Sequence, residues 1–176
     1  MKFDANLDTL AKIATIVIVT LTIGLGVLSF KDWLIGANPA NAQTKFLIPF
    51  SILAISSVLC FLFAPQSYTL TDRQIIINRP LLNRKINLTT LLKFKKATKD
   101  EMAGTIRTFG VGGLFGYYGK FANDLYGEMD FYVTQRKNYV VLITEDKDVI
   151  VLSPNDHSLA ERIEEKMKEI TNPNKS

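Results

Sequence analysis

The residues that most suggest chemistry are glycines gathered in one stretch. Seven of the ten glycines lie between Gly104 and Gly127, and five of those lie between Gly110 and Gly119. Closely spaced glycines can wrap a phosphate with backbone N–H groups, so a nucleotide loop is the first possibility to test. The spacing fails the dinucleotide pattern because Phe115 holds its last glycine position, and no Lys-Ser or Lys-Thr pair follows to make a P-loop. The glycines therefore do not predict nucleotide binding.

Two other roles stay open for this stretch. Glycines permit positive φ angles, bulges and close backbone approach, which a sheet folding over itself requires. Alternatively, the aromatic residues between them form a flexible loop that enters a membrane interface or packs on the ends of hydrophobic helices. The candidate contact residues of this loop are Arg107, Phe109, Gly110, Gly112, Gly113, Phe115, Gly116, Tyr117 and Tyr118.

Residue types that commonly catalyse reactions are isolated in this chain. The sole cysteine, Cys60, lies in a long uncharged segment and can form no intrachain disulfide. The sole histidine, His157, falls in the first turn of a helix expected to face solvent. Glu128 and Asp130 share a strand face but have no evident partner. We therefore predict no enzyme, no metal site and no cofactor.

Positive charge is concentrated after the second hydrophobic segment. Between Arg73 and Lys99 the chain carries eight basic residues and no acidic one. Beside anionic lipid each lysine or arginine contributes about 1 kcal/mol, so this run could hold a tethered domain against a membrane. The candidate lipid-facing residues are Arg84, Lys85, Lys93, Lys95 and Lys96. The alternative is that they only set membrane topology. Nucleic acid is not predicted, because aromatic residues do not interleave with the run.

Two uncharged segments, residues 13–30 and 46–64, must position these groups. Their 18 and 19 residues would each span roughly 27–28 Å as a helix, close to the hydrocarbon thickness of a bilayer. We predict a transmembrane hairpin with an external loop at 31–45 and an N-terminal cytoplasmic tail at 1–12. The alternative is a signal peptide cleaved near Ala40-Asn41-Ala42, but its hydrophobic segment would be unusually long.

The basic run sets the expected orientation. Cytoplasmic segments carry the excess of lysine and arginine, whereas residues 31–45 hold only two basic residues and one acid. We therefore predict a multi-pass protein of the cell membrane with both termini in the cytoplasm. Small residues in the two segments, such as Gly24 and Gly26, would allow close packing with a second copy or another membrane protein.

Residues 66–171 are predicted to form a β-rich domain closed by one helix, followed by a tail at 172–176. Short segments rich in β-branched and aromatic residues indicate strands, and the last ones are expected to form a meander. These segments are 68–70, 75–78, 85–88, 92–97, 126–134, 139–144 and 149–152. Ser153-Pro154 offers a helix start, and Leu159, Ile163 and Met167 then recur at helical spacing.

In its details the chain resembles the bacterial pleckstrin-homology-like (PH-like) domains that follow two membrane spans. The resemblance covers most of residues 66–171. Its most specific part is residues 107–121, Arg-Thr-Phe-Gly-Val-Gly-Gly-Leu-Phe-Gly-Tyr-Tyr-Gly-Lys-Phe, and it continues from Tyr132-Val133-Thr134 to Leu152-Ser153-Pro154. The resemblance implies a PH-like β-barrel or sandwich with one C-terminal helix. It implies architecture more than activity, because fold alone does not supply function.

Three functions follow as hypotheses. The leading one is a non-enzymatic membrane protein that presents a PH-like domain at the cytoplasmic surface, where it binds lipid headgroups or a protein partner. The second is a structural subunit of a membrane assembly. The third is an enzyme with a site near the glycine-rich stretch, which the isolated catalytic residue types disfavour.

Overall fold

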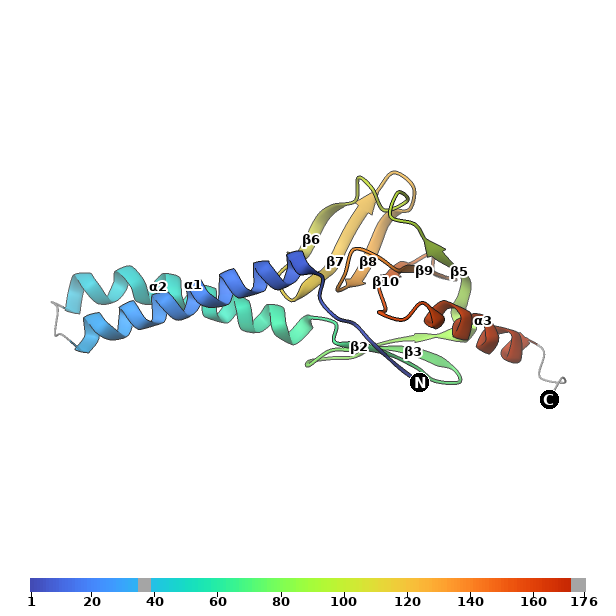
Figure 1. Ribbon diagram of the computed structural model, residues 1–176, viewed down its shortest axis with the longest axis horizontal. Coiled ribbons are helices and arrows are strands. Elements are labelled where there is room, and N and C mark those ends of the chain that lie inside the picture. Colours follow the sequence, from blue (N-terminus) through green and yellow to red (C-terminus); the bar gives the residue numbers. More distant parts are fainter. Residues whose placement is uncertain (35–38, 172–176) are drawn as a thin grey trace.

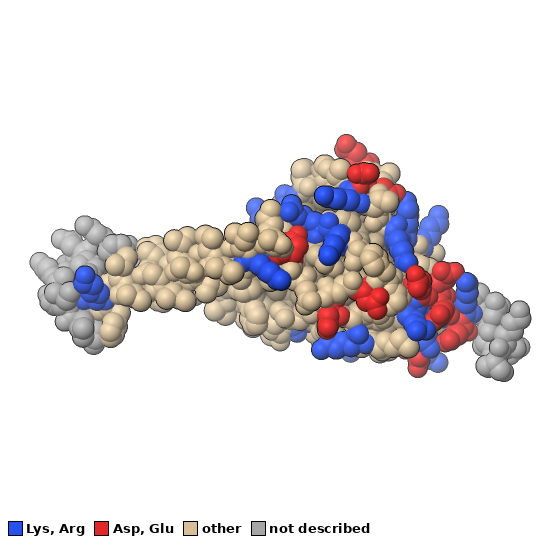
Figure 2. All heavy atoms as spheres, in the orientation of Figure 1, with Lys and Arg blue, Asp and Glu red and all other residues tan. Residues whose placement is uncertain are grey.

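The computed structural model describes residues 1–34 and 39–171, in which two long helices project from a β-rich domain (Figure 1). Helix α1 spans Thr9–Leu34 and helix α2 spans Pro39–Phe63. The two helices run side by side, and their surface carries almost no charge (Figure 2). Lysines and arginines gather instead on the domain.

One of the two helices meets the length and composition of a membrane span among the described residues. The candidate span is Thr9–Lys31, and none of its most apolar window is buried within the protein. The apolar part of α2, Leu47–Phe63, is shorter. The expected loop at 31–45 is helical at both ends, and its residues 35–38 lie outside the described residues, as does the tail 172–176.

A first sheet pairs the strand that precedes α1 with the strands that follow α2. It contains β1 (Lys2–Asp4), β2 (Ser67–Leu70), β3 (Gln74–Asn78) and β4 (Arg84–Asn87), paired antiparallel in that order. Residues 1–12 therefore do not form only a tail, as predicted, because they include β1. In the structure Phe3 lies opposite Tyr68 and is buried.

A second sheet has six strands in the order β5-β9-β10-β8-β7-β6. A short 3₁₀ helix, Leu88–Thr90, precedes it. The strands are β5 (Leu91–Ala97), β6 (Ile106–Gly113), β7 (Gly116–Asn123), β8 (Gly127–Val133), β9 (Tyr139–Thr144) and β10 (Val149–Leu152). The expected meander is wrong here, because β10 lies between β9 and β8 and runs parallel to β8. The two sheets remain separate, so the described strands do not form a closed barrel.

Helix α3 (Ser158–Thr171) covers the core between the sheets. Its Leu159 and Ile163 are fully buried, as the helical spacing predicted. The helix begins later than expected because Ser153 is buried, where its hydroxyl accepts a hydrogen bond from the Thr134 N–H (2.9 Å). Tyr68 links the sheets by donating to the Tyr132 carbonyl (2.6 Å), and burial raises the pKa of Tyr68 to about 12.

Candidate functional site

The glycine-rich stretch forms a β-hairpin, so of the two roles left open by the sequence the flexible loop is wrong. Strands β6 and β7 pair along their length and turn at Leu114-Phe115. Gly110 lies opposite Gly119, and both have φ above +100°. A Cβ on Gly119 would lie only 2.5 Å from the Phe109 carbonyl oxygen. The two glycines therefore let the strands approach closely, as the backbone interpretation of the stretch proposed.

The tip of this hairpin contacts both long helices. The Phe115 N–H donates to the Thr15 hydroxyl of α1 (2.9 Å). The Phe115 ring meets the Phe61 ring of α2 edge to face, with centroids 5.4 Å apart. The Tyr118 hydroxyl donates to the Cys60 carbonyl of α2 (2.5 Å). These contacts fix the domain on the ends of the helix pair rather than leaving it on a free tether.

Asp8 joins the start of α1 to the domain. Its carboxylate accepts from the Ala11 N–H (2.8 Å), which makes it the N-cap of α1. It also accepts from the backbone N–H (3.2 Å) and Nε (3.3 Å) of Arg136 and from the Tyr117 hydroxyl (3.2 Å). Burial raises the pKa of the Asp8 carboxyl, but these hydrogen bonds outweigh burial, and the pKa lies below its usual value. This role of Asp8 was not among the sequence predictions, although an aspartate just before a helix is a known capping signal.

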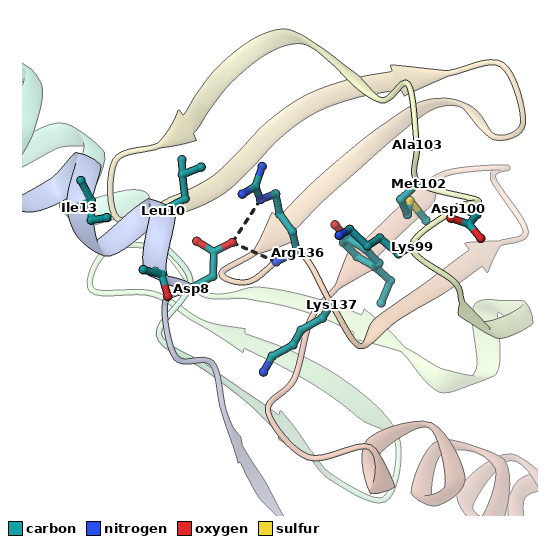
Figure 3. Close-up of a pocket in the computed structure, with 11 residues that line it drawn as sticks. Asp8, Leu10, Ile13, Lys99, Asp100, Met102, Ala103, Arg136 and Lys137 are labelled. Carbon is teal, nitrogen blue, oxygen red and sulfur yellow. Dashed lines mark hydrogen bonds and ion pairs between the residues drawn. The ribbon is translucent and has the colours of Figure 1, made fainter.

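An open groove of about 900 Å³ lies beside this junction (Figure 3). One wall is apolar, because Leu10 and Ile13 of α1 are 49% and 56% exposed. The other wall carries Lys99 and Lys137, which make no ion pair among the described residues, together with Arg136. The full lining is Asp8, Thr9, Leu10, Ile13, Lys99, Asp100, Met102, Ala103, Arg136, Lys137 and Tyr139.

The groove combines a small excess of positive charge with apolar surface. Arg136, Lys99 and Lys137 outnumber Asp8 and Asp100 in its lining, and the Asp8 carboxylate is already paired with Arg136. The apolar wall continues along α1 away from the domain.

The basic residues predicted from the sequence lie elsewhere. Lys93, Lys95 and Lys96 lie on β5, at the opposite edge of the second sheet from β6 (Figure 1). Lys95 pairs with Glu101, and Lys96 pairs with Glu161 (2.9 Å). On β4, Arg84 lies 3.9 Å from Asp148, and Lys85 is exposed. The structure therefore places the three lysines of β5 at the edge of the sheet opposite the hairpin that contacts the helices.

The candidate hairpin residues divide into two groups. Tyr117, Tyr118 and Phe115 contact helix residues or Asp8, and Gly113 and Gly116 are buried at the turn. The remainder lies on the exposed half of β6. That group contains Arg107, Phe109, Gly110 and Gly112.

Metal-ligating side chains do not cluster in the part of the chain that the structure describes. It contains no group of three or more His, Cys, Asp or Glu side chains that could hold a metal ion. His157 is exposed just before α3, and Cys60 lies in α2.

Comparison with known proteins agrees with this architecture. A family model described as Bacterial PH domain matches residues 66–168, which include β2 to β10 and most of α3. No curated protein and no solved structure gives a significant match. The PH-like domain expected from the sequence is thus confirmed, whereas the two membrane spans are supported only for the first helix. Because the match extends over more than half of the sequence, the chain belongs to the bacterial PH domain family.

Proposed function

We propose that this protein is a non-enzymatic membrane protein whose PH domain binds an anionic lipid headgroup at the cytoplasmic surface. The observation that carries the proposal is the groove at the base of α1, where unpaired lysines face an apolar helix wall. A soluble ligand would need no such continuous wall. A lipid lying beside α1 would use both surfaces at once.

The pairing of β1 with β2 supports a membrane hairpin. β1 precedes α1 and β2 follows α2, yet both strands belong to one sheet. A single crossing would leave the two strands on opposite sides of the membrane. If α1 crosses, α2 must therefore return, and its 25 residues would extend roughly 37 Å.

The distribution of charge supports a cytoplasmic domain. A reporter enzyme fused after Ser176 is expected to be active in the cytoplasm, and a reporter inserted at residues 35–38 is expected to be active outside it. The two fusions should be compared in intact cells with reporters that function on only one side. Activity of both fusions on the same side would contradict the hairpin, and the reversed pattern would contradict the orientation.

The double variant Lys99→Gln/Lys137→Gln tests the lipid site. At about 1 kcal/mol for each lost ion pair between a lysine and the lipid phosphate, its affinity for phosphatidylglycerol should fall roughly 30-fold. The measurement is a titration of the full chain in neutral detergent, with bound lipid counted by native mass spectrometry. Arg136 is left in place because it also holds Asp8.

The matched control is Lys85→Gln/Lys93→Gln, which removes the same charge from exposed positions on β4 and β5. It should keep most of the affinity, because neither side chain lines the groove or makes an ion pair among the described residues. Equal loss in both double variants would mean that net charge alone attracts the lipid. No loss in either would contradict the proposed site.

A second candidate function is assembly with a protein partner or a second copy. It is favoured by β6, an edge strand on which Ile106 and Phe109 are 65% and 77% exposed. An exposed apolar edge strand can pair with a strand from another chain. Failure of the lipid titration, together with crosslinking through β6 in native membranes, would favour this function.

A further inference from the structure

The turn between β3 and β4, residues 79–83, lies against the end of α2. The Leu81 N–H donates to the Leu62 carbonyl at 2.9 Å, which holds the turn beside the last turn of that helix. The Asn83 side chain closes the turn by accepting from the Arg79 N–H (2.9 Å). The turn is therefore fixed at the level where α2 enters the domain. The lysine groove, in contrast, lies beside α1.

Leu82 occupies a position that folding alone does not explain. Its φ is +58°, a left-handed conformation that favours glycine or asparagine over leucine. Its side chain is 68% exposed and that of Leu81 is 41% exposed, so the protein itself buries little of either. An apolar side chain held in an unfavourable backbone conformation and turned outward suggests an apolar environment outside the protein.

Arg79 places a fixed cation beside these leucines. Its guanidinium carbon lies 5.9 Å from the centroid of the Phe63 ring and 5.6 Å from that of the Tyr132 ring. Its Nε is buried without a hydrogen-bond partner, and no ion pair of the described residues includes Arg79. The aromatic rings orient the charge but do not neutralise it. A phosphate would supply both the missing acceptor and the missing negative charge.

We propose that this turn is a second membrane contact, in which Leu81 and Leu82 enter the bilayer interface and Arg79 binds a lipid phosphate. This inference rests on the proposed crossing of α2, because that crossing sets the depth of the turn. A tethered domain would then be held at two points, the groove beside α1 and the turn beside α2. The partner is the lipid leaflet, since apolar side chains and a phosphate site lie together on one short turn.

Depth-dependent quenching tests the turn in the full chain. Leu82→Cys is made in a Cys60→Ser background, which keeps the backbone carbonyl that accepts from Tyr118. The cysteine is labelled with the environment-sensitive dye NBD, and the protein is reconstituted in phosphatidylglycerol-containing vesicles. The dye emission should shift to the blue, and lipids with a doxyl quencher near the headgroup should remove most of its intensity.

Two leucines of similar exposure serve as controls. Leu92 on β5 is 56% exposed and Leu125 in the β7–β8 turn is 61% exposed. Dyes at Leu92→Cys and Leu125→Cys should keep their aqueous emission and resist quenching. Quenching of Leu82→Cys no stronger than that of these controls would overturn the insertion of the turn.

A probe at Leu21→Cys in α1 separates this inference from the proposed function. If quenchers deep in the bilayer reach Leu21→Cys but no quencher reaches Leu82→Cys, the helices insert and only the turn proposal fails. If neither is quenched, the membrane anchor itself fails. Arg79→Gln should reduce the quenching of Leu82→Cys, whereas Arg73→Gln in the β2–β3 turn should not, and an unchanged Arg79→Gln signal would overturn the phosphate contact.

Discussion

Alanine at Gly119 is expected to destabilise the full-length protein by roughly 2–5 kcal/mol. The range combines about 1–3 kcal/mol for overpacking with about 1–2 kcal/mol for an unfavourable backbone conformation. The new Cβ would lie 2.5 Å from the Phe109 carbonyl oxygen and 2.8 Å from the Gly110 Cα, and neither backbone atom can move without separating the strands. Thermal unfolding in detergent should show a midpoint lower by roughly 5–15 °C.

Two other glycines provide the controls for Gly119→Ala. Gly127 has φ of +66° but open space around its Cβ, so Gly127→Ala measures the backbone cost alone. Gly112 has neither a positive φ nor a backbone clash, so Gly112→Ala should change the midpoint least. A midpoint for Gly119→Ala equal to that of Gly127→Ala would show that the strands do not approach as closely as the structure indicates.

Asp8→Ala is expected to cost roughly 2–4 kcal/mol and to loosen the domain on α1. The substitution removes the N-cap of α1, worth about 1 kcal/mol, and leaves Arg136 and Tyr117 without their shared acceptor. The unfolding midpoint should fall. Distances between spin labels on α1 and α3, measured by pulsed electron spin resonance, should broaden because the junction no longer fixes the angle between helix and domain.

The variant Asp8→Asn separates the contribution of the helix N-cap to stability from that of the negative charge. Asparagine caps helices as well as aspartate, so this variant should retain most of the stability while losing the ion pair with Arg136. The pKa of Asp8 is depressed, so its stabilising effect is present above the unfolded-state pKa and is lost as pH falls through the folded-state pKa. Acidification should therefore narrow the difference in unfolding midpoint between the natural chain and Asp8→Asn. Identical label distances in all three proteins would show that Asp8 does not orient the domain.

The sequence predicted where strands lie along the chain better than it predicted which strands pair with one another. The segments at 139–144 and 149–152 match β9 and β10, because runs of β-branched residues mark buried strands. Nothing in those runs specifies that β10 pairs in parallel with β8, since alternation fixes which face a side chain takes rather than which strand lies beside it. β6 and β7 were missed as strands because glycines interrupt the expected pattern.

The site was predictable only in part. Aromatic residues between glycines correctly suggested contact with the helix ends, and Phe115 and Tyr118 make that contact. The groove was not predictable, because Lys99 and Lys137 are brought to α1 by the sheet and not by sequence proximity. The lysine-rich strand β5 shows the opposite case. Its basic residues are close together in the sequence, but their spacing did not predict at which edge of the sheet the strand would lie.

The short strand β1 also sets an order for biosynthesis. It is synthesised before both long helices, and its partner β2 is made only after them, which takes several seconds at about 5–20 residues per second. If both helices cross the membrane as proposed, the first sheet can close only in a chain whose second helix has returned to the starting side. A chain with one failed insertion would keep the apolar Phe3 unpaired and exposed, which would mark it for quality-control proteases.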